Sequence, residues 1–173
     1  EMGGLAIQDP SKGLRFQLWK GWWDSTDSTV YLEPEDTGVP TAIHTAANVI
    51  EFCFTFDQNM RWSTACRLTG NTVEHRWYDT AVEAYVTTTY PSITSVRLAL
   101  DDKRDMQVQF GGTDMILTYI SGGQVRWRIQ RDRFLTEYVH PSLAISDSFR
   151  ISHFGMNTKN RLQWRIGPRH LNT

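Results

Sequence analysis

The sequence predicts an all-β protein, and three observations lead to this expectation. Apolar and polar residues alternate with a period of two, turn residues separate the alternating segments, and no window of about eleven residues carries a convincing amphipathic helix. In residues 124–130, for example, Val125, Trp127 and Ile129 alternate with Gln and Arg. We therefore expect an antiparallel β-sandwich, or a partial propeller-like stack of hairpins, with an extended N-terminal arm.

The same alternation places strands along most of the chain. Glycines in the segments 69–71 and 121–123 supply the positive φ that tight hairpins need. The alanines of residues 41–48 are compatible with one short helix. The expected strands are residues 14–19, 29–32, 49–56, 63–68, 72–78, 84–88, 96–100, 115–120, 124–130, 136–140, 149–153 and 161–166.

A weak internal repeat runs through these strands, with copies ~40 to 50 residues apart, the size of a four-stranded blade or a pair of hairpins. The repeated tryptophans have Val, Leu and Ile as their period-two neighbours, so we expect them in the core; a stacking platform for sugars or bases is the alternative. The copies begin at Phe54, Leu98 and Phe149, and their tryptophans are Trp77, Trp127 and Trp164.

The length of 173 residues fits one globular domain, and a hydrophobic content of 40% argues against disorder of the whole chain. Residues 1–48 differ from the rest because polar and proline-bearing acidic segments interrupt them. We expect this part to be an arm with long loops that docks onto a partner. Residues 49–173 are expected to form a single β-rich domain that contains the repeat.

Charge is segregated along the chain although the net charge is only −1. Residues 1–120 carry nine Lys and Arg against sixteen Asp and Glu, and residues 121–173 carry nine against three. The two ends either neutralise each other within the fold or face opposite charges on a neighbouring copy, head to tail. The balanced net charge argues against a nucleic-acid partner, and the lack of a long apolar segment argues against a membrane.

No motif for a nucleophile, a phosphate-binding loop or a metal site is recognisable, so we expect no catalytic residue, no metal and no cofactor. Asp57 and Asp101, which follow strands at equivalent places in the repeat, are expected to form turns rather than a catalytic pair. Cys53 and Cys66 lie on strands that we expect to be neighbours. Two small buried apolar residues are the preferred interpretation, with a cross-strand disulfide as the alternative.

The arginine-rich run at residues 126–133 is the most distinctive segment. Its outward arginines, together with those of the matching strand 161–166, predict a positive ladder on one sheet face. They either pair with nearby acids in solvent or form a protein interface, because Arg is enriched in interfaces and binds carboxylates bidentately. The candidate interface residues are Arg126, Arg128, Arg131, Arg133, Arg161 and Arg165.

Three tryptophans keep a carbohydrate-binding function open. Trp22 and Trp23 precede a polar loop, and Trp62 is a further candidate stacking platform for a host surface glycan. A third possibility, a glycan-cleaving enzyme, requires a carboxylate pair across a cleft. The small size of the chain argues against it.

Several segments in order along the chain resemble a group of tailed-bacteriophage virion proteins encoded among tail and fibre genes. The resemblance covers residues ~50 to 166 and excludes residues 1–48. It implies a virion location in the tail, oligomers that follow the tail symmetry, tail proteins as partners, and no catalysis. The segments are Phe54-Thr-Phe-Asp-Gln-Asn-Met60, Trp77-Tyr-Asp79, Leu100-Asp-Asp-Lys-Arg104, Leu117-Thr-Tyr-Ile120, Gln130-Arg-Asp-Arg-Phe134, Glu137-Tyr138, Gly155-Met-Asn157 and Asn160-Arg-Leu-Gln-Trp164.

The leading hypothesis is therefore a non-catalytic structural component of a phage tail, in the fibre or adaptor region. The β pattern, the segregated charge and the abundant aromatics agree with such a module without reference to the resemblance. The alternative is a carbohydrate-binding module that recognises a host surface glycan.

Overall fold

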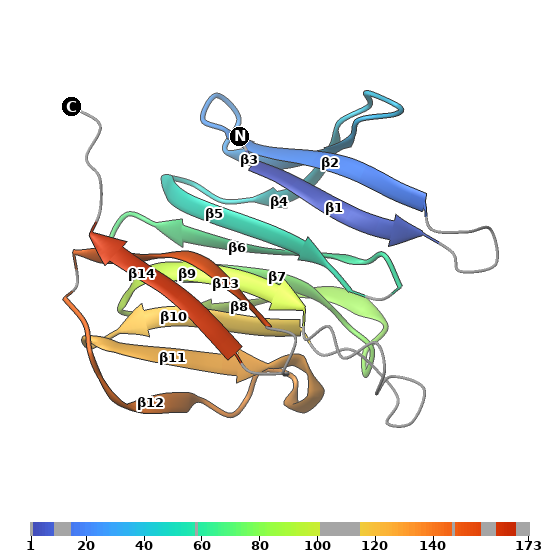
Figure 1. Ribbon diagram of the computed structural model, residues 1–173. Helices are drawn as coiled ribbons and strands as arrows, with labels where there is room; N and C mark the ends of the chain where they lie inside the picture. Colours follow the sequence, from blue (N-terminus) through green and yellow to red (C-terminus); the bar gives the residue numbers. More distant parts are fainter. Residues whose placement is uncertain are drawn as a thin grey trace, which may run out of the picture.

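The protein folds into four antiparallel sheets in the computed structural model, as the all-β prediction requires (Figure 1). The structure describes residues 2–8, 15–57, 59–100, 115–146, 148–156 and 162–168. Sheet A comprises β1 (Met2–Gln8), β2 (Arg15–Asp24), β3 (Thr29–Pro34) and β4 (Thr41–Thr45). Sheet B comprises β5 (Val49–Phe56), β6 (Trp62–Leu68), β7 (Val73–Asp79) and β8 (Ala84–Tyr90). Sheet C comprises β9 (Ile93–Leu100), β10 (Met115–Ser121), β11 (Gln124–Ile129) and β12 (Tyr138–Ala144), and sheet D comprises β13 (Phe149–Met156) and β14 (Leu162–Pro168).

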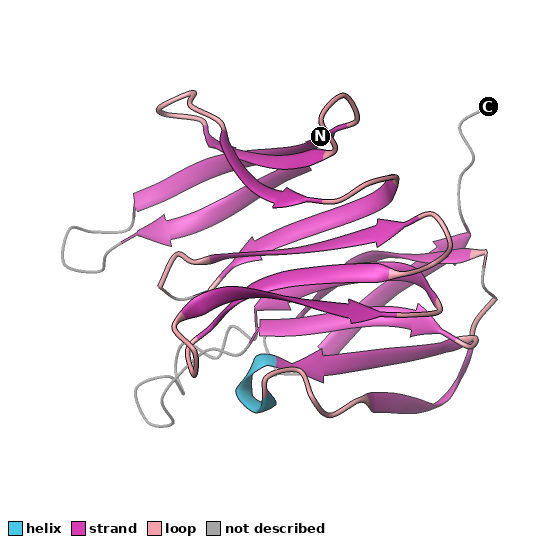
Figure 2. Cartoon of the chain, turned by 180° about the vertical axis from the view of Figure 1, so that it is seen from behind, coloured by secondary structure: helices cyan, strands magenta, loops and turns pink. Residues whose placement is uncertain are grey.

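The sheets are stacked in chain order, A on B on C, with sheet D against the far face of sheet C (Figures 1 and 2). Each four-stranded sheet is a simple meander, in which strands that follow each other in sequence are hydrogen-bonded neighbours. The first strands β1, β5, β9 and β13 contact one another in succession. Several antiparallel sheets packed face to face confirm the expected all-β, sandwich-like fold.

Three apolar layers separate the four sheets, and the period-two alternation explains them. In β7, Val73, His75 and Trp77 are buried against sheet C, while the residues between them lie toward sheet A. Sheet B thus packs on both faces, which agrees with nearly continuous burial along β6. Val30 and Leu32 fill the layer between sheets A and B. The layer between sheets C and D holds Ile116, Ile120, Val125, Ile145 and Ile151.

Gly21 in β2 packs tightly between its neighbour Leu32 and Phe54 of sheet B. A Cβ atom at this position would lie 2.8 Å from Leu32 Cδ2 and 2.8 Å from Phe54 Cε1. Real Cβ atoms do not come this near to other heavy atoms. The lack of a side chain at Gly21 therefore permits the spacing between the two sheets.

The predicted repeat corresponds to the sheets. Its first copy is sheet B and its second copy is sheet C, with a glycine-containing hairpin between the second and third strands of each. Gly70 and Gly122 have φ of 91° and 58°, as the tight turns require. In the third copy the repeated tryptophan occupies a different strand. Trp164 lies in the second strand of its sheet, whereas Trp77 and Trp127 lie in the third strands of theirs.

The prediction of an arm with long loops for residues 1–48 was wrong in the part that the structure describes, where this region forms sheet A. The strands expected at 14–19 and 29–32 exist, but the polar residues at the turns 25–28 and 35–40 concealed that they belong to one sheet. The short helix expected at 41–48 is also absent: β4 pairs with β3 and buries Ile43. Tertiary packing overrides the weak helix preference of the alanines.

Cys53 and Cys66 are both buried and both free, which confirms the preferred interpretation. The strand register explains why no disulfide forms. Cys53 pairs with Ala65 and Cys66 pairs with Phe52, so the two thiols point to opposite faces of sheet B. Burial raises the pKa of the Cys53 thiol to about 12.

A buried carboxylate, Glu51 in β5, joins three of the sheets. Its Oε2 accepts a hydrogen bond from Arg67 Nε at 2.9 Å, and its Oε1 accepts bonds from Arg97 and from Ser95 Oγ. Ser95 Oγ in turn accepts the backbone N–H of Ile151 in β13 at 3.1 Å. The Glu51 side chain is only 4% exposed. Sheets B, C and D therefore share one polar junction near their first strands.

Glu51→Gln is expected to destabilise the protein by about 3–5 kcal/mol, because the substitution leaves two arginines at the junction without their counter-charge. Urea unfolding would measure the change. Glu35→Gln, at an exposed turn, is the matched control and should change stability by less than about 0.5 kcal/mol. Equal stability of the two variants would contradict the assigned role of Glu51.

Gly21→Ala is expected to destabilise the fold by about 1–3 kcal/mol, because the added methyl group has no space between sheets A and B. Gly167→Ala in β14 is the matched control, since nothing lies within 4 Å of a Cβ at that position. Thermal unfolding of both variants would test this. A Gly21→Ala protein as stable as the wild type would show that the sheets are not so closely spaced.

Candidate assembly surface

The segment between β11 and β12 begins with the 3₁₀ turn η2 (Gln130–Asp132) and continues through two residues with positive φ. Arg133 and Phe134 have φ of 60° and 59°, a conformation that costs free energy in residues other than glycine. The surrounding contacts must offset this cost. We call residues 131–139 the assembly loop.

Phe134 anchors the assembly loop in the core. Its side chain is 1% exposed, and its ring meets the rings of His75 and Trp77 edge to face at centroid distances of 4.6 and 4.9 Å. Both partners belong to β7 of sheet B. The loop is therefore held against a different sheet from the one that carries it.

Arg133 makes a second link to sheet B. Its Nε and Nη2 donate to Asp79 Oδ2 at 3.0 and 2.6 Å. Asp79 is buried at the end of β7, and its Oδ1 also accepts the backbone N–H of Ala81 at 2.9 Å. A charge-assisted pair of this kind is stronger than one between neutral groups.

Arg128 ties the inner side of the loop from β11. Its Nη1 donates to the carbonyl oxygens of Phe134 and Leu135 at 3.0 and 2.8 Å, and its Nε donates to the Tyr119 hydroxyl at 2.9 Å. The guanidinium also lies over the Tyr90 ring, 4.9 Å from its centroid. One side chain thus fixes the backbone of the loop at two consecutive residues.

Glu137 completes this network. Its carboxylate pairs with Arg126 and Arg128 and accepts the hydroxyl of Tyr119. Burial alone would raise the pKa of Glu137, but the hydrogen bonds from Tyr119 and Arg126 outweigh it and lower the pKa. Burial and the bond to Glu137 raise the pKa of Tyr119. The carboxylate therefore stays charged and the phenol stays protonated at neutral pH.

The outer side of the assembly loop is exposed. Leu135 is 75% exposed, Tyr138 and Val139 are each about two-fifths exposed, and Arg131 lies on the surface. The last two apolar residues belong to β12, the outer edge strand of sheet C. Exposed Leu and Tyr beside Arg have the composition of a protein interface, and a loop fixed in advance binds at a lower entropic cost.

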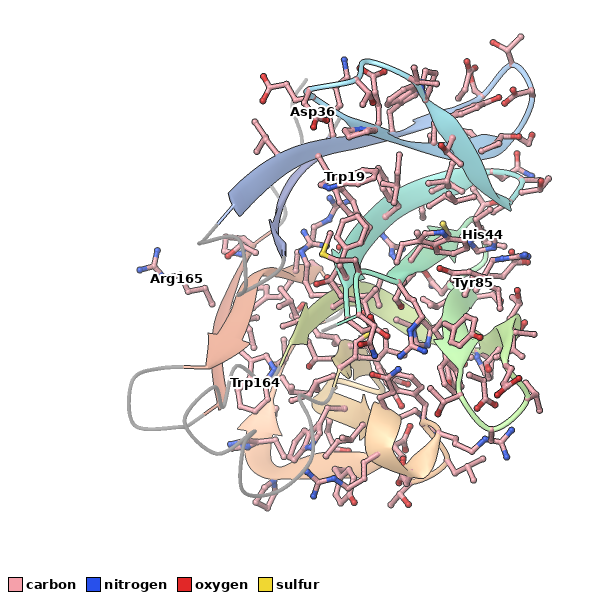
Figure 3. All side chains as sticks on the ribbon, turned by 90° about the vertical axis from the view of Figure 1, so that its right-hand side faces the viewer. Trp19, Asp36, His44, Tyr85, Trp164 and Arg165 are labelled. Carbon is pink, nitrogen blue, oxygen red and sulfur yellow. The ribbon has the colours of Figure 1, made fainter. Side chains whose placement is uncertain are left out.

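The five predicted arginines that the structure describes lie on different surfaces. Arg126, Arg128 and Arg133 pair with acids of the same chain, which was one of the two interpretations. Arg126 and Arg128 lie on the sheet B side of β11, whereas Arg165 projects into solvent from sheet D (Figure 3). The described arginines therefore do not form one ladder, and Arg161 lies outside the described residues. Their contacts with another subunit stay a prediction.

The three candidate glycan platforms occupy different environments. Trp23 packs between sheets A and B, and its indole N–H donates to the Ala46 carbonyl at 2.9 Å. Trp62 stacks on Tyr85 with a centroid distance of 3.8 Å. Trp22 stacks on Tyr31 at 5.5 Å, on the face of β2 opposite to Trp23. Trp22 and Trp62 are half-buried, so part of each ring faces solvent.

Asp57 has the turn role that the sequence predicted. Its Oδ1 accepts the backbone N–H groups of Asn59 and Arg61 at 2.8 and 2.9 Å, and its Oδ2 binds the Arg61 side chain. Asp101 lies outside the described residues. In the part of the chain that the structure describes, no helix has the length and apolarity needed to cross a membrane.

Sequence reasoning missed Leu135 and Glu137 as parts of the surface. A usable signal existed for Glu137, which is the acid that follows four closely spaced arginines. No comparable signal existed for a groove between β4 and β7, because its residues are distant along the chain.

The chain matches no protein-family model, no curated protein and no solved structure. The resemblance to phage virion proteins therefore remains an expectation from the sequence. The arguments about function that follow depend on the geometry of this chain.

The free energy of unfolding is expected to decrease as the pH falls from about 6.5 toward 3. Burial, reinforced by nearby His44, lowers the pKa of His75 to about 3, so the unfolded chain binds a proton that the folded chain does not. His75 contributes at most about 1.4 kcal/mol per pH unit to this dependence of the free energy of unfolding on pH. Burial also lowers the pKa of His44, which acts in the same direction.

Urea unfolding between pH 7 and 4 measures this dependence. His75→Leu should make the free energy of unfolding depend less steeply on pH, by an amount that corresponds to at most one bound proton. Some pH dependence should remain, because His44 is still present. Parallel pH profiles of the variant and the wild type would show that His75 is protonated in the folded protein.

Proposed function

We propose that the protein is a non-catalytic structural module that binds neighbouring subunits through the assembly loop. The observation that carries the proposal is the contrast between the two sides of the loop. Arg128, Arg133 and Phe134 hold its inner side to two sheets, while Leu135 is 75% exposed on its outer side. The inner contacts offset the strain at Arg133 and Phe134, and the loop therefore presents Leu135, Tyr138 and Val139 in a fixed conformation.

The proposed location is a bacteriophage tail, in the fibre or adaptor region, with other copies and tail proteins as partners. The resemblance of residues ~50 to 166 to tail-region virion proteins supports this location. Charge supports contacts between copies: residues 18–36 of sheet A carry one lysine and five acids, whereas the exposed Arg131 and Arg165 lie in η2 and β14. Opposite charges on distant surfaces favour head-to-tail association.

The alternative is a carbohydrate-binding module for a host surface glycan, and Trp22 is the observation that favours it. The ring stacks on Tyr31 on the face of sheet A away from sheet B. The Tyr31 hydroxyl donates to Asp27, so aromatic and polar groups lie together. Quenching of Trp22 fluorescence by host polysaccharide, in a protein that stays monomeric, would favour this function over assembly.

Leu135→Asp is expected to lower the molar mass of the protein in solution, because a charge replaces the apolar contact at the centre of the proposed interface. Multi-angle light scattering would measure the mass. Stability should change by less than about 0.5 kcal/mol, since the side chain makes few contacts in the monomer. Ile50→Asp, at another exposed apolar position that lies outside the assembly loop and outside residues 18–36, is the matched control.

An assembled wild type, a smaller Leu135→Asp variant and an unchanged Ile50→Asp variant would support the proposal. A wild type and a Leu135→Asp variant of the same mass would contradict it.

A further inference from the structure

A polar groove of about 360 Å³ lies between sheets A and B, at the edge away from β1 and β5. Its volume falls in the range of small-molecule sites. Figure 3 shows His44 and Tyr85 on this side of the molecule. The groove is remote from the assembly loop in sequence, and the inference below does not depend on the proposed assembly function. The polar residues that line the groove are Thr29, His44, Thr45, Glu74, Arg76 and Thr87.

His44 is occupied on both ring nitrogens. Nδ1 lies 3.0 Å from Thr64 Oγ1, and Nε2 lies 3.2 Å from Glu74 Oε2. Because burial lowers the pKa of His44, the ring is neutral: Thr64 donates to Nδ1, and Nε2–H donates to Glu74. The ring thus orients Glu74, whose Oε1 accepts no hydrogen bond from a described residue. The groove therefore offers a fixed acceptor.

Arg76, two residues further along β7, supplies a donor. Its Nε is buried and has no hydrogen-bond partner among the described residues. The guanidinium lies near Trp62, 5.9 Å from the ring centroid, and forms no ion pair with a described carboxylate. A buried N–H without a partner is costly in a folded protein. The Nε is shielded from the groove, but Nη1 and Nη2 are not among the buried atoms and have no partner among the described residues, so they can receive an acceptor from a ligand in the groove.

We propose that this groove binds a saccharide that carries a carboxylate. The carboxylate of the sugar pairs with Arg76 in the bidentate geometry that guanidinium favours. A sugar hydroxyl donates to Glu74 Oε1, and Thr45 and Thr87 serve as donors or acceptors for the remaining hydroxyls. A small anion without hydroxyl groups would lie beside the negative charge of Glu74 and could donate no hydrogen bond to its carboxylate. A neutral sugar would leave Arg76 without a counter-charge.

The test is a titration of the full chain with glucuronate, followed by the NMR signal of the Arg76 Nε–H group. Saturable binding should shift this signal, because a carboxylate bound to Nη1 and Nη2 changes the electronic environment of the same guanidinium group. Arg76→Gln should weaken binding at least tenfold, and Thr87→Val by a smaller factor. Thr89→Val, on the same face of β8 but outside the groove lining, and Arg131→Gln should bind as the wild type does.

Two comparisons make the ligand class falsifiable. Glucose, the neutral counterpart, should bind at least tenfold more weakly than glucuronate, and sulfate should not displace glucuronate at equal concentration. Equal affinity for glucose, full displacement by sulfate, or no saturable binding of glucuronate to the wild type would each overturn the proposal. If Arg76→Gln fails to fold, the Nε–H shift in the wild type and the Thr87→Val to Thr89→Val comparison still decide it.

Discussion

Glu51 holds the first strands of the stack together, and the rest of the architecture depends on that junction. Its carboxylate binds Arg67 of its own sheet and Arg97 of the next, and Ser95 extends the junction to β13. Apolar layers between sheets supply most of the driving force, but they are tolerant of sliding. A buried carboxylate with partners in fixed positions allows one alignment of the sheets, because any displacement leaves a charge unpaired.

The assembly loop is a consequence of this alignment. Its residues Arg133 and Phe134 belong to sheet C in sequence but bind Asp79 and Trp77 of sheet B, so the loop conformation exists only while the two sheets keep their relative position. The groove at the edge of sheets A and B depends in the same way on the contact at Gly21. Both surfaces are formed between sheets rather than within one sheet.

Period-two alternation was sufficient to predict β5, β7 and β11 almost to their ends, because each buries alternate residues in the same layer. Strands were expected at 14–19 and 29–32, but the polar turns around them favoured an arm over a sheet, and the alanines of β4 favoured a short helix. The arginines were recognised, but their partners could not be: Asp79 is 54 residues from Arg133, and only the stacking of the sheets brings them together. For the same reason the His44 groove had no signature in the sequence.

The central claim is that the outer side of the assembly loop is covered by another subunit while its inner side is held by the monomer. Hydrogen exchange at concentrations where the protein is monomeric and where it is assembled tests this most directly. We predict that amides of residues 135–139 become slower to exchange on assembly, whereas those of the turn at 35–38 in sheet A keep their rates unless they form the opposing surface. Assembly without any change of exchange at residues 135–139 would contradict the account.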